Sequence, residues 1–288
     1  WLVGAALPPA GVLFLMMRRP PRAARALTLF PCAAPFRSVV ASVMIGARGA
    51  SFGDLGGALL ARTDTIGEAA IARRLPRTAL AMLVGAALAT AGVGLQAVTR
   101  NPLADPGVLG ITSGAALAVV ITITVIGARG PAATTVAAII GAAAAAGLLY
   151  ALSTVGVGGA SPLKIVLAGA AISAMCVSVT SALILPRPDA MEAFRFWQIG
   201  GVGGAQWGTV SWILPVIVVG VLAAFASTRA MNALALGDEL AAGLGERLGG
   251  ARFAITAGAI VLAGTATAVA GPIGFVGLIV PHLCRLVV

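Results

Sequence analysis

Charged residues are absent from six long intervals of this chain. These are residues 78–99, 106–128, 130–163, 165–186, 196–228 and 253–284. An α-helix needs roughly 20 apolar residues to cross about 30 Å of hydrocarbon, so each interval holds one spanning helix, and the longer ones have room for a loop or a second helix. In lipid every backbone amide must be paired within its own segment, which makes helices the default spanning form. The intervals therefore predict a protein that crosses a membrane several times.

The composition excludes a water-soluble domain. Only 10% of the residues are charged and 59% are hydrophobic, with a mean hydropathy of +1.04, whereas soluble domains carry about 25% charged residues. The alternating pattern of a membrane β-barrel is not present in the sequence. We expect an all-α fold, a polytopic transmembrane helical bundle. The 38 glycines predict tight packing, because membrane helices associate through small residues.

The charge and the reactive residues argue against two other classes of function. The net charge of +10 comes from basic residues that lie mostly in short connections between apolar runs, as membrane orientation requires. No basic face with interleaved aromatics indicates nucleic-acid binding. No set of residues suits catalysis, and Cys32, Cys176, Cys284 and His282 lack the spacing of a metal site. We expect neither enzymatic activity nor a metal or cofactor bound by this chain.

Apolar runs and their polar breaks predict the helices and the domain organisation. Residues 1–26 form an N-terminal segment with a basic stretch, and 27–288 form the transmembrane domain. A weak span is expected at about 27–47. The other helices are expected at 77–98, 108–127, 132–153, 163–185, 208–227, 252–270 and about 273–288.

Two polar connections carry more information than the spans. Residues 100–107 combine Asn101 and Asp105, which suit turns, with Pro102 and Pro106, which exclude helical geometry. This link is either a simple tight turn or a stiff element that lines or closes a path. Residues 229–251 predict a short amphipathic helix outside the membrane, which either lies on the membrane surface or docks a partner.

At these connections the sequence resembles the permease subunits of ATP-driven importers for iron chelates, haem and vitamin B12, a family of type II ABC importers. The resemblance covers about residues 45–288, with a weaker match over 196–207. Its specific motifs are RLPR at 74–77 continuing to Gln96, NPLADPGVLG at 101–110, LALGDELA at 234–241 and GPIGFVGLIVPH at 271–282.

The resemblance implies a subunit of ten spans, of which we expect about eight here, with two more following the Pro-His motif. It also implies a second permease subunit in a homo- or heterodimer, two ATPase subunits that carry ATP and Mg, and an extracytoplasmic substrate-binding protein. Arg74 and Arg77 resemble the external arginines that meet acidic residues of that binding protein. The gate and translocation path correspond to Gln96, Asn101, Pro102, Leu103 and Ser161. Residues that resemble the coupling helices on the ATPase are Leu234, Leu236, Gly237, Asp238, Glu239, Ala241, Leu244 and Gly245.

The distribution of basic residues is consistent with external docking. With residues 18–25 and 229–252 inside, ten basic residues fall inside and eight outside, a weak positive-inside bias for which an acidic external partner supplies a cause. We expect a multi-pass protein of a bacterial cytoplasmic membrane that imports ferric siderophores by alternating access. Haem and cobalamin remain open as substrates. The alternative from another class is an ion-coupled secondary carrier, although no clear span has an ionisable residue at its centre.

Overall fold

The computed structural model describes residues 29–46, 51–60, 64–128, 130–154, 162–187, 191, 201–235 and 248–287. All regular secondary structure within these residues is helical. The α-helices are α3 (Leu29–Met44), α4 (Phe52–Leu59), α5 (Ile66–Thr99), α6 (Ile111–Ile121), α7 (Pro131–Thr154), α8 (Pro162–Ile184), α10 (Trp207–Ala226), α11 (Thr228–Ala235), α13 (Leu248–Ala270) and α14 (Val276–Val287), and a π-helix, η2 (Thr122–Ile126), follows α6. The expected all-α fold is confirmed.

Five of these helices are long and apolar enough to cross a membrane: α5, α7, α8, α10 and α13. Two shorter apolar helices, Ile111–Ile126 and Val276–Leu286, complete the set found in the described residues. Each of these helices overlaps one of the charge-free intervals, as predicted.

The first long helix begins earlier than the sequence predicts. α5 starts at Ile66 and not at residue 77, because Thr65 and Glu68 form a capping box: the Thr65 hydroxyl accepts the Glu68 N–H, and the Glu68 carboxylate accepts the Thr65 N–H. Pro76 lies inside the helix, which membrane-protein helices tolerate when neighbouring groups satisfy the backbone. The run from Arg73 to Arg77 is therefore helical, and the prediction that it precedes the helix is wrong.

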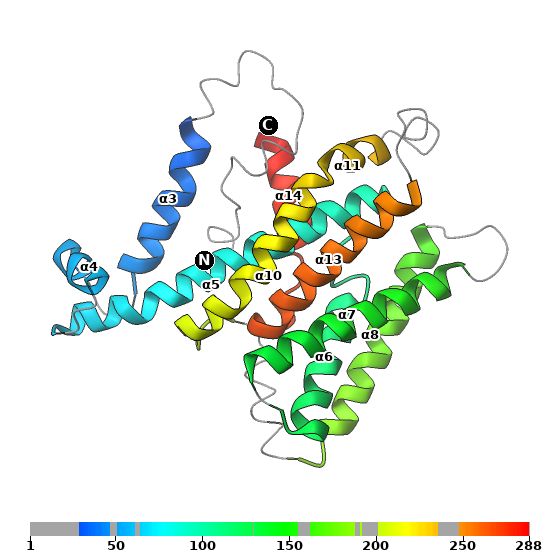
Figure 1. The fold of residues 1–288 in the computed structure, drawn as a ribbon, viewed down its shortest axis with the longest axis horizontal. Helices are drawn as coiled ribbons and strands as arrows, with labels where there is room; N and C mark the ends of the chain where they lie inside the picture. Colours follow the sequence, from blue (N-terminus) through cyan, green and yellow to red (C-terminus); the bar gives the residue numbers. More distant parts are fainter. Residues whose placement is uncertain are drawn as a thin grey trace.

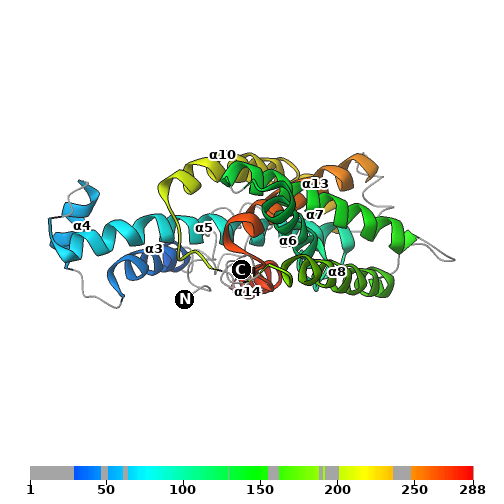
Figure 2. The same cartoon turned by 90° about the horizontal axis from the view of Figure 1, so that it is seen from below.

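The centre of the bundle is formed by α5 and α13, which pack against each other. α10 and α7 both contact α13; α6, α7 and α8 contact one another; and α14 crosses α5 (Figure 1). α3 and α4 contact the N-terminal end of α5, apart from the group formed by α6, α7 and α8 (Figures 1 and 2).

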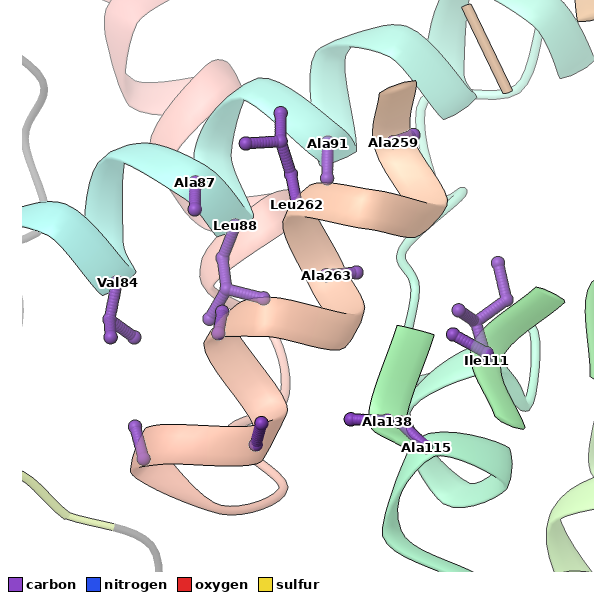
Figure 3. Close-up of a cluster of buried hydrophobic side chains, with 14 of the residues drawn as sticks. Val84, Ala87, Leu88, Ala91, Ile111, Ala115, Ala138, Ala259, Leu262 and Ala263 are labelled. Carbon is purple, nitrogen blue, oxygen red and sulfur yellow. The ribbon is translucent and has the colours of Figure 1, made fainter. Parts of the chain in front are cut away.

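Small residues build the centre of the bundle. Ala87 and Ala91 of α5, Ala138 of α7 and Ala263 of α13 are all 0% exposed, and their side chains lie close to the neighbouring ribbons in Figure 3. Larger side chains such as Leu88 and Leu262 fill the space between them, and others, such as Leu167 of α8, are exposed on the outside. This is the small-residue packing that the glycine and alanine content predicts.

Candidate functional site

The link after α5 forms a rigid turn that projects from the bundle. Arg100 ends α5 with a left-handed backbone, φ 49°. Asn101 Oδ1 accepts the Leu103 N–H at 2.9 Å, and the Asn101 carbonyl accepts the Ala104 N–H at 3.1 Å, the pattern of an Asx turn. Pro102 is exposed and Leu103 is 62% exposed. Three of the predicted gate residues, Asn101, Pro102 and Leu103, thus lie on a stiff turn.

Asp105 is buried, as are Ala104 and Pro106 beside it, whereas Pro102 and Leu103 earlier in the link are exposed. The Asp105 side chain is 2% exposed, and Oδ2 accepts the Gly107 N–H at 2.9 Å. Backbone N–H groups of Val108, Phe275 and Gly277 also bond to this carboxylate. Burial raises the pKa of the Asp105 carboxyl, while these backbone donors act to lower it. Since Phe275 and Gly277 lie at the start of α14, Asp105 joins the link to that helix.

The start of α14 accommodates Asp105 only because Gly277 has no side chain. A Cβ at Gly277 would lie 2.7 Å from Asp105 Oδ1 and 3.0 Å from the Leu88 carbonyl oxygen, too close for either contact. Phe275, just before the helix, has φ 65°, a left-handed conformation that is uncommon for a residue with a side chain. The surrounding contacts hold it there.

Gln96 binds the carbonyl of the same residue, Gly277. Its side chain is 5% exposed, and Nε2 donates to the Gly277 carbonyl at 3.1 Å. Its Oε1 accepts a hydrogen bond from Arg285 Nη2 at 2.6 Å, so α5 and α14 are joined twice by one glutamine. The structure brings Gln96 close to the Asp105 site, but as a buried connector between helices.

At the opposite end of α5, the two arginines of the 74–77 motif differ in their surroundings. Arg74 is half-buried, and its Nη1 donates to the carbonyls of Val43 at 3.0 Å and Met44 at 3.1 Å, the last residues of α3. Arg77 is exposed. Arg74 therefore connects the end of α3 to α5, and these contacts with Val43 and Met44 do not involve Arg77. Docking by both residues stays a prediction.

The predicted coupling segment is described only at its start. Leu234, on α11, is 0% exposed and packs with Met231 and Ile255 against Ala97 and Val98 of α5. It anchors α11 to the bundle. The remaining predicted coupling residues and one gate residue lie outside the described residues: Leu236, Gly237, Asp238, Glu239, Ala241, Leu244, Gly245 and Ser161.

Sequence reasoning missed three contributors to the site that Asp105 and Gln96 form with the start of α14. It assigned Asp105 only a turn, gave Arg285 no role of its own, and gave Gly277 no role beyond its motif. The one available signal was that Asp105 and Gly277 fall in the two longest motifs. Among the described residues no group of three or more His, Cys, Asp and Glu side chains is arranged to hold a metal ion.

The fold is that of an ABC transporter membrane subunit. A solved structure described as an inward-facing, metal-chelate type ABC transporter superposes on this chain with a TM-score of 0.70 at 24% identity, covering 100% of this chain and 82% of that one. The FecCD transport family model matches residues 35–288. The chain belongs to this family, whose members are non-catalytic permease subunits, and it is a multi-pass membrane protein.

Relatives of the chain serve several substrates. The Fe(3+)-citrate import permease YfmD of Bacillus subtilis is 41% identical over 74% of this chain and 62% of the relative. The ferric enterobactin permease FepD of Escherichia coli is 39% identical over 75% of this chain and 64% of the relative. The hemin permease HmuU of Yersinia pestis is 41% identical over 74% and 65%. The chain thus spans somewhat less than two thirds of these relatives.

Proposed function

We propose that this chain is the membrane-spanning subunit of an ATP-driven importer that moves a ferric siderophore across the cytoplasmic membrane. The match of residues 35–288 to the FecCD family carries the proposal. Relatives named for ferric citrate, enterobactin and probable siderophore transport support an iron chelate as the substrate. Hemin and cobalamin permeases are of similar identity, so haem and cobalamin are the second candidates.

In this proposal the path runs between permease subunits, and the 101–103 turn closes its inner end. Pro102 and the Asn101 Asx turn supply the stiffness that a gate needs, and the exposed Leu103 supplies an apolar surface. A stiff gate opens by moving as a body with the helices that carry it. The path would be exposed alternately to each side as ATP is consumed.

The partners in this proposal are a second permease subunit, two ATPase subunits and an external substrate-binding protein. ATP and Mg are bound by the ATPase subunits, and this chain itself binds no cofactor and catalyses no reaction. Residues 229–251 rest on the ATPase, and the burial of Leu234 against α5 gives that segment a firm attachment to the helix that leads to the gate.

Uptake by reconstituted vesicles tests this function. The complex of permease, ATPase and binding protein is placed in vesicles, and accumulation of a radioactive ferric siderophore is measured with ATP or with a non-hydrolysable analogue inside. We expect accumulation with ATP only, and competition by haem or cobalamin separates the second candidates. Uptake that follows an ion gradient without ATP would instead support a secondary carrier.

External docking is tested most cleanly at Arg77, because Arg74 also holds α3. Reversing Arg77 to Glu should abolish stimulation of ATP hydrolysis by the binding protein at low salt, where charge complementarity acts most strongly on encounter. The double reversal of Arg74 and Arg77 should do the same. Unchanged stimulation in both would remove the docking assignment and leave the transport function untouched.

A further inference from the structure

The N-terminus of α14 is capped by a side chain from a distant part of the sequence. The first four N–H groups of a helix have no partner within it, and a nearby residue usually supplies the cap. Here the carboxylate of Asp105, on the link after α5, accepts the N–H of Gly277 in the first turn and of Phe275 just before it. The link and the helix are consequently held by one charged group.

The contact requires an aspartate and close backbones on both sides. The same carboxylate accepts N–H groups of Gly107 and Val108 from its own link. A Cβ at Gly107 would lie 2.9 Å from Oδ2 and one at Gly277 would lie 2.7 Å from Oδ1, so glycines at both positions allow this approach. Hydrogen bonds to an ionised acceptor are about twice as strong as neutral ones.

A second contact holds Gly277 in place from the carbonyl side. Its N–H bonds to Asp105 and its carbonyl accepts from Gln96, while Gln96 also binds Arg285 further along α14. A shift of α14 relative to α5 or to the link would break charge-assisted hydrogen bonds in a buried place, where unpaired groups are costly.

We propose that Asp105 is a positioning residue that clamps the start of α14 to the 101–103 turn, so that the turn and the helix change position as one unit. The clamp adds α14 to the moving parts of the inner gate. The role in gating rests on the proposed transport function, whereas the mechanical connection does not. A change at the exposed end of α14 would then reach Leu103 without passing through α5.

The connection is measured as a distance between two spin labels in the full chain in nanodiscs. Cys32, Cys176 and Cys284 are replaced by alanine, and the labels are attached to Leu103→Cys in the turn and Ile279→Cys on α14, both of which replace exposed side chains. We expect one narrow distance distribution in this parent. Asp105→Asn, which removes the charge and sets an amide NH₂ against backbone N–H donors, should broaden it or add a second distance.

Asp54→Asn is the matched control, because Asp54 also accepts a backbone N–H, that of Ser51, at a helix N-terminus, that of α4. It should leave the distance between positions 103 and 279 unchanged. A distribution in Asp105→Asn as narrow as in the parent would overturn the proposal, and so would equal broadening in both variants.

A second measurement needs no variant and decides the case if Asp105→Asn does not insert. The amide hydrogens of Phe275 and Gly277 should exchange at least about tenfold more slowly than those of Gly208 and Thr209, the factor that one charge-assisted hydrogen bond supplies. Those two residues begin α10, whose N-cap Gln206 makes no side-chain cap bond. Equal exchange rates would overturn the clamp. Neither measurement involves transport, so a failed uptake experiment leaves this result standing.

Discussion

Gly92 and Gly277 mark the place where α5 and α14 cross in backbone contact. A Cβ at Gly92 would meet the Gly277 backbone, and a Cβ at Gly277 would meet both Asp105 and Leu88. Membrane helices gain most of their association energy from such close approach, because lipid provides no hydrophobic force between them. The lack of a side chain at Gly92 and at Gly277 is what allows the two helices to approach this closely.

Replacing Gly92 with Ala should destabilise the protein by roughly 1–3 kcal/mol, the usual cost of overpacking a close contact. Gly258→Ala on α13 is the matched control, since nothing lies within 4 Å of a Cβ there. That variant should be neutral or slightly stabilising, because alanine exceeds glycine in helix propensity by up to about 1 kcal/mol. The midpoint of thermal unfolding in detergent distinguishes them, and equal midpoints would contradict the crossing.

At the scale of elements, α3 and α4 are attached to α5 by polar contacts as well as by the small cluster of Val43, Ala58 and Ile71. Arg74 binds the last carbonyls of α3. Asp54 of α4 accepts the Thr65 hydroxyl at 3.0 Å, so the capping residues of α4 and α5 bond to each other. The N-terminal end of α5 is therefore held in a defined arrangement with α3 and α4.

Arg74→Gln should loosen the end of α3 while Arg77→Gln should not. A cation at a helix C-terminus contributes about 0.3–1 kcal/mol, so the amides of Met44 and Ile45 should lose roughly two- to fivefold in protection from hydrogen exchange. Mass spectrometry of the peptide that contains them provides the measurement. Equal loss in the two variants would show that general charge, and not the Arg74 contact, holds α3.

The attachment of α4 should depend on pH through Asp54. Its pKa lies below the ordinary value because the Ser51 N–H, the Ser51 hydroxyl and the Thr65 hydroxyl all bond to the carboxylate. A lowered pKa means that the stabilisation is complete only well above the ordinary carboxyl pKa, at about pH 5, and is lost as pH falls through the folded-state value. Protection of the Ser51 amide should therefore decrease between pH 5 and pH 2 after correction for intrinsic exchange. In Asp54→Asn it should show no such decrease.

Sequence reasoning located three of the long helices to within one residue at each end. The predicted spans 132–153, 163–185 and 208–227 differ by one residue at each end from α7, α8 and α10. It failed where local bonding decides the boundary: Thr65 and Glu68 extend α5 outward, and the Thr122–Ile126 turn is a π-helix, which composition does not reveal.

Of the site formed by the 101–107 link, Gln96 and the start of α14, only the turn was predicted, for a physical reason. The Asn101 turn follows from local chemistry, because Asn and Pro determine the backbone of their own neighbours. The partners of Asp105 and Gln96 lie on α14, and their proximity depends on how two helices pack. No pattern within either motif specifies that contact.

At the scale of the whole molecule, the outward surfaces of α7, α8 and α10 carry large apolar side chains. Examples are Ile140, Leu167 and Val219, which are 62%, 60% and 66% exposed. Exposed apolar surface of this extent suits lipid or another membrane subunit. α10 also begins with an exposed tryptophan, Trp207, the residue type that favours the membrane–water interface.

Trp207 and Trp212 should lie at different depths in the bilayer. They are separated by about 8 Å along α10 at 1.5 Å per residue, and both are exposed. In single-tryptophan variants, lipids brominated near the headgroup should quench Trp207 more strongly, and lipids brominated near the chain end should quench Trp212 more strongly. The reverse order would contradict the orientation of α10.

The Gly92–Gly277 contact divides α5 into two unequal arms. From that fulcrum the helix extends about 39 Å toward Ile66 and about 10 Å toward Thr99, at 1.5 Å per residue. If α5 tilts about the Gly92–Gly277 contact, its N-terminal end moves about four times as far as its C-terminal end. Such a lever reduces displacement and increases force. A large displacement under a small force at the N-terminal end of α5 would therefore become a small displacement under a larger force at the 101–103 turn.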